Sequence, residues 1–577
     1  MLPLAWRLKR EADRKVDMGP RALTTGTMNS SVSPKEGAKG SDVYDGTGDK
    51  RVDLSVHMVR GASGTELSIL ILEVARVHLV DAFVMAFHSR NVRGGKGERQ
   101  IFTELYKALV AAQEPLATHL LDLIPHYGSW RDLLSLSDSC PANCPYDRLK
   151  DSIYGLIVKQ LTEDAATPVG TSISLVGKWA PREGSTNDKH AKALAALLFP
   201  DKPDYRKRYR QLIVGLNRRL DTIETHMCGD SWATIKPAGV PGRAGKLYAK
   251  ALLNESRTEK GAIRHPDSED RMACRDHFKE HFAAAAAGHA TVHGSKTVFP
   301  HEVVKKAKQE SLSEGEKDQL RAVWSSMIAD LKAAGGLDRA VLMADFSGSM
   351  QNAGSQGDTP YWVSMALGIL GSCATNGKFM TFDSKPAWHR LPSADLFDCL
   401  DSIGRHVSQG TSTDFQAACD LLLADLKAAR CKPGEEPKYL LVLTDMNWDE
   451  ACASNGASQF TGSSYRHHVK TAPWQTHLDM IKESFRRAGE DMHGAGQALT
   501  PPQIVIWNLA ANPSDFHATA DTPGVSLLSG WSPTQFKILM KEGPRQITPL
   551  ETLRLELDDP QYDLIRERIA AFLKKAD

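Results

Sequence analysis

The stretch RAVLMADFSGSM, residues 339–350, decides the fold. An apolar run of strand length leads directly into a polar loop, in which Asp345, Ser347 and Ser349 are spaced by two. Three further apolar runs of similar length follow, namely KFMTF, KYLLVLTD and QIVIWNLA. Helical stretches, expected at about 361–374, 413–430 and 475–488, separate these runs. The alternation predicts a parallel sheet covered by helices, that is, a doubly wound α/β fold.

The chain before this stretch has a different periodicity. From about residue 65 to 335, apolar residues recur at three- and four-residue spacing, as in LSILILEVARVHLVDAFVMAF. This pattern predicts an all-α domain of paired helices, HEAT-like in character, although no exact internal repeat is found. The predicted organisation is a disordered leader at 1–50, a helical repeat-like domain at 51–335 and an α/β domain at 336–577. The α/β domain is expected to carry an insertion at about 446–502.

Composition is typical of a soluble globular protein and favours an intracellular, cytoplasmic location. Hydrophobic residues make up 41% and charged residues 24% of the 577 residues, and the net charge is +1. Nine scattered cysteines fit reduced thiols better than a disulfide framework, and Cys140 and Cys144 fit a loop better than a metal site. No apolar run has the length of a membrane span. The basic N-terminus leaves organelle targeting open, but its Glu11 and Asp13 favour a disordered leader.

Three loops at one predicted edge of the sheet offer hard oxygen ligands. In a doubly wound sheet, ligands bind beyond the carboxyl ends of the strands. Asp345, Ser347 and Ser349 follow the first strand, Thr413 precedes a helix, and Asp445 ends the run KYLLVLTD. Carboxylate and hydroxyl oxygens suit a divalent cation such as Mg²⁺. The alternative is a cluster of helix caps and turns without a metal.

These five residues resemble the metal-ion-dependent adhesion site of von Willebrand factor type A domains. That motif has the form Asp-x-Ser-x-Ser, with a Thr from a second loop and an Asp from a third. The order of strands, loops and helices is also similar to that Rossmann-like fold. The resemblance implies that the ion keeps one coordination position free for an acidic group of a partner.

The helical half contains two basic clusters that are candidates for binding RNA or other anions. The connection RNVRGGKGER, residues 90–99, is rich in Gly and carries Arg90, Arg93, Lys96 and Arg99. It lacks the order of a nucleotide P-loop, so its alternatives are phosphate contact and a solvated turn. Lys178 and Arg182 flank Trp179 in GKWAPR. Trp130, Trp179 and Trp232 are expected to anchor the core between helices, with stacking on RNA bases as the alternative.

Several longer motifs resemble the uncharacterised family numbered twenty-eight twenty-eight among the domains of unknown function. They span about residues 80 to 450: RNVRGGKGER, HYGSWRDLL, LVGKWAPRE, IETHMCGDSW, VPGRAGKLY, FPHEVV, ADFSGSM, QGTSTDFQAA and LVLTDMNWD. The architecture is more distantly similar to the Ro ribonucleoprotein, or TROVE, family. That resemblance implies a ring of helical repeats closed by a type A domain, with small structured RNAs bound on the ring.

The sequence favours a non-enzymatic binding protein, in which a helical scaffold holds RNA and the α/β domain recruits a partner through its ion. The alternative is a metal-dependent scaffold for protein assembly without nucleic acid, which the near-neutral net charge favours. A metal-dependent hydrolase using Asp345 and Asp445 is a third hypothesis. It is the weakest of the three because the sequence shows no nucleophile–base pair and no nucleotide fingerprint.

Overall fold

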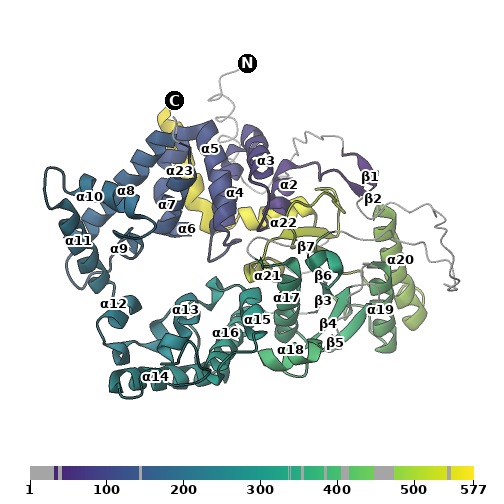
Figure 1. Ribbon diagram of the computed structural model, residues 1–577. Coiled ribbons are helices and arrows are strands. Elements are labelled where there is room, and N and C mark those ends of the chain that lie inside the picture. The colour runs from purple at the N-terminus through teal and green to yellow at the C-terminus, as the bar shows by residue number, and fades with distance from the viewer. Residues whose placement is uncertain are drawn as a thin grey trace, which may run out of the picture.

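The computed structural model describes residues 32–36, 42–141, 146–335, 337, 339–351, 357–382, 386–404, 415–446, 474–541 and 547–576. Most of these residues lie in helices, and a six-stranded sheet forms in the C-terminal half. The helices of the N-terminal half form an arc (Figure 1), whose upper end contacts the last strand of the sheet and whose lower end contacts helices that cover the sheet. Within the described ranges, no helix combines the length and apolar character needed to cross a bilayer.

The sheet has the order β5-β4-β3-β6-β7-β8, and only β5 runs antiparallel to its neighbour. Counted in chain order, this is the 3-2-1-4-5-6 order of a doubly wound fold, whose crevice lies between the first and fourth strands. The four predicted strands are confirmed, whereas β5 and β8 were not predicted. β5 has no apolar run because half of its residues are polar. The strands are β3 (Ala340–Asp345), β4 (Lys378–Phe382), β5 (Ala387–Arg390), β6 (Tyr439–Thr444), β7 (Gln503–Asn508) and β8 (Val525–Ser529).

The two faces of the sheet belong to two different hydrophobic cores. Val341 and Met343 face one core, which includes apolar residues of α19 (Phe415–Ala428) and α20 (Trp474–His493). Leu342 and Ala344 face the other core, which includes α17 (Pro360–Ala374). Alternate residues of a strand point to opposite faces, so a continuous apolar run serves both cores.

The helices of the N-terminal half divide into two groups, one for each of these two cores. The upper group packs into the first core, and the lower group packs into the second. The upper group consists of α2 (Lys50–His57), α3 (Gly64–Val77), α4 (Leu79–Arg90), α5 (Arg99–His119), α6 (Ile124–Tyr127), α7 (Trp130–Ser139), α8 (Tyr146–Ala166), α9 (Val176–Trp179), α10 (Asp188–Leu198) and α11 (Tyr205–Arg219). The lower group consists of α12 (Ile223–Cys228), α13 (Gly242–Leu252), α14 (Glu269–Ala286), α15 (Pro300–Ala307) and α16 (Glu314–Ala333).

The last two helices of the chain return to the helical half. α22 (Pro549–Leu557) contacts α2 and α4, and α23 (Asp563–Ala576) contacts α4 and α5. Their apolar side chains are part of the same core as the upper group. The C-terminal helices therefore share a hydrophobic core with the upper group of the helical half.

Part of the predicted disordered leader is ordered. β1 (Pro34–Glu36) pairs with β2 (Asp42–Tyr44), and the N–H of Tyr44 donates to Phe516 O at 2.9 Å. The contact of Tyr44 with Phe516 joins residues more than four hundred positions apart, so the local composition of the leader gave no sign of it.

Candidate functional site

The loop after β3 is held by a short hydrogen-bond network. Asp345, the last residue of β3, is fully buried. The N–H of Ser347 donates to Asp345 Oδ1 at 2.8 Å, and the hydroxyl groups of Ser347 and Ser349 lie 3.0 Å apart. Three of the predicted metal-site residues are thus brought together in one tight turn.

The neighbouring strand β6 adds a hydroxyl group and a second carboxylate. Thr444 Oγ1 donates to Asp345 Oδ2 at 3.0 Å, and Asp445 follows with only 4% of its surface exposed. Burial, and then the negative charge of Asp445, raise the pKa of Asp345 to about 7. Hydrogen bonds from Ser347 and Thr444 lower that pKa but do not cancel the increase. Two buried carboxylates at the crevice thus repel each other, and a bound cation would remove that repulsion.

The turn after Asp445 has an unfavourable backbone conformation. Met446 has a φ of 66°, in the left-handed region that side chains other than glycine rarely adopt. Its N–H donates to Thr444 Oγ1 at 3.1 Å, and its carbonyl oxygen accepts from Nε2 of His517 at 2.8 Å. Burial lowers the pKa of His517 to about 4, which keeps this imidazole neutral. Such strain persists where the surrounding structure enforces it, often at functional sites.

Thr444 and His517 were missed by the sequence analysis. Thr444 precedes the predicted ligand Asp445, but only the pairing of β6 with β3 brings its hydroxyl group to Asp345. His517 follows β7 in a segment without a recognisable motif. Of the predicted metal residues, Thr413 lies outside the described residues. The same holds for residues 447–473 of the predicted insertion, whereas α20 occupies much of the remainder.

The oxygen atoms on these two strands suit a hard divalent cation. They comprise the carboxylates of Asp345 and Asp445 and the hydroxyl groups of Ser347 and Ser349. In the part of the chain that the structure describes, no group of three or more His, Cys, Asp or Glu side chains could hold a metal ion. A metal at this edge would therefore depend on serine hydroxyl groups together with the two carboxylates.

The basic glycine-rich connection at 90–99 is largely bound within the fold: Arg90 and Lys96 are buried, whereas Arg93 is exposed and Arg99 is partly exposed. Arg90 Nε donates to Asp132 Oδ2 at 2.7 Å, and Arg99 pairs with the other oxygen of the same carboxylate. Arg93 donates to His126 O at 2.7 Å. Asp132 and His126 both belong to the motif HYGSWRDLL, so the two motifs bind each other. These contacts give the three arginines a structural role. Because Arg90 is buried, it cannot contact an anion from solvent.

Lys96 of the same connection is bound to the sheet half. Its side chain is fully buried, and Nζ donates to Ser529 O at 2.8 Å. A side chain on Gly95 would place its Cβ 2.1 Å from His88 O, and one on Gly94 would place its Cβ 2.4 Å from Gln561 Oε1. Gly95 is therefore required by close packing against α4, and Gly94 lies directly against the side chain of Gln561 from the C-terminal half, so phosphate binding is not needed to explain either glycine.

The second basic cluster is more accessible. Lys178 is partly exposed and lies 3.8 Å from Glu224, while Arg182 is exposed. Trp130 and Trp179 are half-buried, and Trp232 is buried under the guanidinium group of Arg271 at 3.7 Å. Trp232 is thus placed in the core, as expected for an anchor between helices.

A carboxylate, an imidazole and hydroxyl groups also meet around α12. His226 Nε2 lies 2.7 Å from Asp221 Oδ1, and His226 Nδ1 lies 2.8 Å from Thr234 Oγ1 and 3.3 Å from Ser231 Oγ. A nucleophile and its base have this arrangement in hydrolases. No such arrangement was predicted from the sequence, because a turn brings these residues together.

The surroundings of this triad favour a structural role. An acyl-transfer site needs free N–H groups beside the nucleophile to stabilise an oxyanion. The N–H groups of Trp232 and Ala233, which follow Ser231, instead donate to the carboxylate of Asp270 at 2.7 and 2.8 Å. The cluster therefore stabilises the turn that joins α12 to the next segment.

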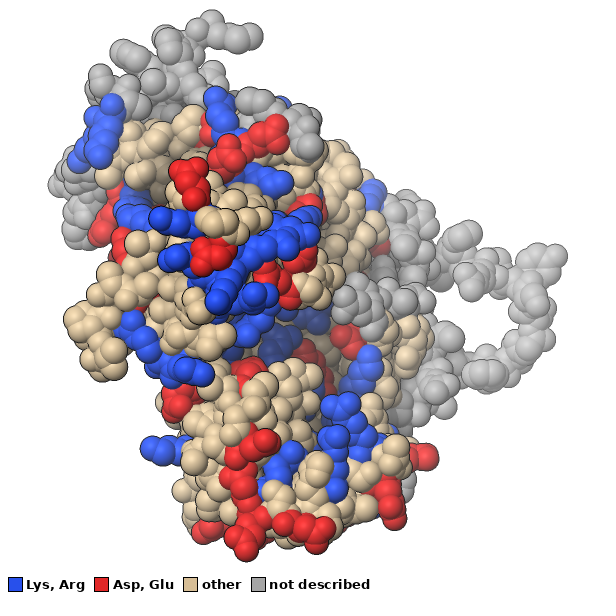
Figure 2. Space-filling view, turned by 60° about the vertical axis from the view of Figure 1, so that its left-hand side comes forward, with Lys and Arg blue, Asp and Glu red and all other residues tan. Residues whose placement is uncertain are grey.

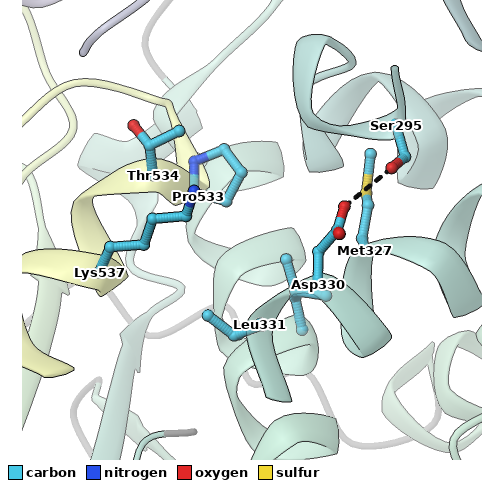
Figure 3. Close-up of a pocket in the computed structure, with 8 residues that line it drawn as sticks. Ser295, Met327, Asp330, Leu331, Pro533, Thr534 and Lys537 are labelled. Atoms are coloured by element: carbon cyan, nitrogen blue, oxygen red, sulfur yellow. Dashed lines mark hydrogen bonds between the residues drawn. The ribbon is translucent and has the colours of Figure 1, made fainter. Parts of the chain in front are cut away.

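A cleft lies at the junction of the two halves (Figure 3). Its cavity volume is about 40 Å³, and it is open to solvent. Ser295 Oγ donates to Asp330 Oδ2 at 2.9 Å on the helical side. The opposite side is formed by η7 (Pro533–Gln535) and α21 (Phe536–Lys541). Most of the lining is apolar, and the cleft shows no set of polar groups that would select a ligand.

Two families match successive parts of the chain. Residues 142–337 match a family described as Domain of unknown function (DUF2828), and residues 339–562 match one described as Domain of unknown function (DUF7788). The predicted resemblance to the first family is confirmed for residues 142–337, whereas the motifs RNVRGGKGER and HYGSWRDLL precede the matched residues. However, the motifs ADFSGSM, QGTSTDFQAA and LVLTDMNWD lie in the second family and were wrongly attributed to the first.

One curated protein is similar over most of its length. The uncharacterized protein L728 of Acanthamoeba polyphaga mimivirus is 24% identical over 521 residues, which is 87% of this chain and 83% of the viral protein. Neither the family descriptions nor this name states an activity. The resemblances to von Willebrand type A and Ro proteins therefore remain predictions.

Proposed function

We propose that this chain is a non-enzymatic binding protein that captures an acidic group of a partner through a divalent cation at Asp345 and Asp445. The observation that carries this proposal is the position of these two buried carboxylates: Asp345 ends the first strand of the doubly wound sheet, and Asp445 directly follows the fourth strand. Hard oxygen ligands favour Mg²⁺. The strand order and the loop sequence support the resemblance to a von Willebrand type A domain.

The captured group would complete the coordination shell of the ion. Ser347 and Ser349 add neutral oxygens, so two protein carboxylates offset the charge of a divalent cation. The two carboxylates of the protein balance the charge of the ion. A carboxylate of the partner would then bind this ion directly as a further oxygen ligand. Under this proposal the site binds a ligand and does not catalyse a reaction.

Metal-dependent capture can be measured directly. Immobilised full-length chain should retain a partner from extract in Mg²⁺ and release it in chelator, whereas Asp345→Ala should retain none in either buffer. Asp491→Ala is the matched control. Asp491 pairs with Lys427 near the C-terminal end of α20, and this end of the helix leads to the amino end of β7, whereas the metal edge lies at the carboxyl ends of the strands. Equal retention in Mg²⁺ and chelator would contradict the proposal.

We also propose that the helical half holds RNA. The supporting observation is the distribution of charge on the side of the molecule where α9 to α12 lie. Lys and Arg gather at mid-height on this face, around a hollow between the upper and lower parts, while Asp and Glu are frequent at the lower end (Figure 2). A local basic surface on a chain of net charge +1 can attract a polyanion without a global field.

A titration of fluorescent RNA over a range of salt concentrations tests this second activity. Phosphate contacts release counterions, so the affinity should fall steeply as salt increases. No binding at low salt would exclude RNA and leave the alternative function, metal-dependent protein assembly without nucleic acid. In that case, capture in Mg²⁺ would persist after nuclease treatment.

A further inference from the structure

The most basic helix of the described chain lies where the upper group passes into the lower group. α11 reads YRKRYRQLIVGLNRR and carries six Lys and Arg residues and no Asp or Glu. We infer that the outward face of α11, centred on Gly215, is the surface against which RNA phosphates bind. This inference rests on the proposed RNA binding, and it replaces the connection at 90–99 as the predicted contact.

The inward face of α11 is fully occupied. Tyr209, Ile213, Leu216 and Asn217 are buried, at the spacing of one helical face. The hydroxyl group of Tyr209 donates to Pro181 O at 2.9 Å, and Asn217 Nδ2 donates to Gly177 O at 2.8 Å. These contacts fix the rotation of the helix, so the opposite face must point to solvent.

Part of the positive charge is already neutralised within the fold. Arg206 and Arg210 both lie near Glu183, at 3.6 and 3.0 Å, and Arg208 pairs with Asp204 at 2.8 Å. These three arginines share two carboxylates. They stiffen the flank of the helix and still leave a positive excess there.

The outward face carries the cations that are not neutralised. Lys207 and Arg218 are exposed, and neither forms an ion pair with any described residue. They lie on one side of the helix, eleven residues apart, which spans roughly 16 Å along the axis. Gln211, between them, is also exposed and can donate through its amide group. Cations spread in a line without counter-charges suit a chain of phosphates better than a single carboxylate.

Gly215 in the middle of this face has no structural explanation within the chain. A Cβ added to it would meet no atom within 4 Å, so packing does not require a glycine. Glycine inside a helix costs up to about 1 kcal/mol relative to alanine. Its absence of a side chain leaves the helix backbone open between Gln211 and Arg218, which permits close approach of a sugar-phosphate backbone.

The test compares two double variants with the same change in net charge. Lys207→Glu/Arg218→Glu should weaken the binding of single-stranded RNA at least about tenfold. It should also reduce the slope of log affinity against log salt concentration by an amount that corresponds to about one or two phosphate contacts. Lys574→Glu/Lys575→Glu, on exposed residues at the end of α23, should bind as the wild type does. Because phosphates are recognised, single-stranded DNA should show the same loss.

A second pair of variants probes the open backbone without changing charge. Gly215→Leu should keep or raise thermal stability and should weaken RNA binding, because the side chain occupies the space that the phosphates need. Gly155→Leu is the matched control, since Gly155 also lies inside an exposed helix with no atom within 4 Å of an added Cβ. It should leave RNA binding unchanged.

The possible failures are distinguishable. If the wild-type chain binds no RNA at low salt, the proposed RNA binding falls and this inference falls with it. If the wild type binds RNA and either Lys207→Glu/Arg218→Glu or Gly215→Leu binds equally well, the inference alone is overturned. Circular dichroism of each variant shows whether the helices remain folded, and the unaffected controls exclude a general effect of charge or of a leucine.

Discussion

Lys96 and Ser529 join the two halves of the molecule through a buried contact. Lys96 Nζ donates to Ser529 O at 2.8 Å and to Ser529 Oγ at 2.7 Å, although 433 residues separate them in sequence. Burial lowers the pKa of Lys96 to about 8, so its charge is costly to hold there. Ser529 Oγ in turn donates to Ser55 O, which ties α2 to the same point. The connection between α4 and α5 is therefore attached to the end of β8 through Lys96, Ser529 and Ser55, and we call this contact the latch.

Ser529→Ala should weaken this latch. The substitution removes one acceptor of the buried ammonium group and the side-chain donor to Ser55 O, at an expected cost of about 1 to 3 kcal/mol in the free energy of unfolding. Denaturant unfolding followed by fluorescence measures this cost. Ser152→Ala, at a partly exposed site on α8, is the control and should change the unfolding free energy little. An unchanged unfolding midpoint for Ser529→Ala would show that the latch does not contribute to stability.

Gly95→Ala should be strongly destabilising. The added Cβ would lie 2.1 Å from His88 O, so the backbone of the connection must move away from α4. We expect a loss of more than about 3 kcal/mol, as for other severe steric conflicts in a core. Gly155→Ala, in open space within α8, should instead stabilise by up to about 1 kcal/mol. Thermal melting of the two variants would contradict the packing argument if both shifted in the same direction.

Asp345→Asn should separate stability from metal binding. Because burial and Asp445 disfavour the charged form of Asp345, its pKa is raised to about 7. Removing the charge should keep or increase the melting temperature in chelator. Mg²⁺ should raise the melting temperature of the wild type, since a ligand stabilises the state that binds it, and should leave Asp345→Asn unaffected. Equal stabilisation of both proteins by Mg²⁺ would place the ion elsewhere.

His517 should make the protein sensitive to mild acid. Burial lowers the pKa of this imidazole from 6.5 to about 4, so the folded state binds fewer protons than the unfolded state between these values. The contribution of His517 to stability is therefore complete above about pH 6.5 and is lost as the pH falls towards 4. His517→Gln keeps a donor for Met446 O and should show a weaker dependence of unfolding free energy on pH.

The control for this prediction is an exposed histidine. His277 lies on the exposed side of α14, so His277→Gln should leave the pH dependence of the wild type intact. A His517→Gln variant with the same acid sensitivity as the wild type would show that other groups cause it. Measurements at a series of pH values in one buffer mixture keep the ionic strength constant.

The metal edge was largely predictable from local sequence. Strand-length apolar runs ending in Asp345 and near Asp445 fix both the strands and the edge of the sheet at which their carboxylates lie, because parallel strands end on the same side. The hydrogen bond from Thr444 and the histidine after β7 could not be predicted. They depend on which strands pair and on how a later loop folds back, and neither is encoded in the spacing of neighbouring residues.

The sequence by itself determined the alternation of strands and helices, the helical periodicity of the first half and the two carboxylates at the crevice. Tertiary structure alone decided the role of the cations. Arg90 and Lys96 look like a solvent-facing cluster in sequence, yet the fold buries both against Asp132 and Ser529. Periodicity reports which face of an element is apolar, whereas the partner of a charged side chain depends on elements hundreds of residues away. For the same reason, only the fold revealed that α22 and α23 complete the helical half.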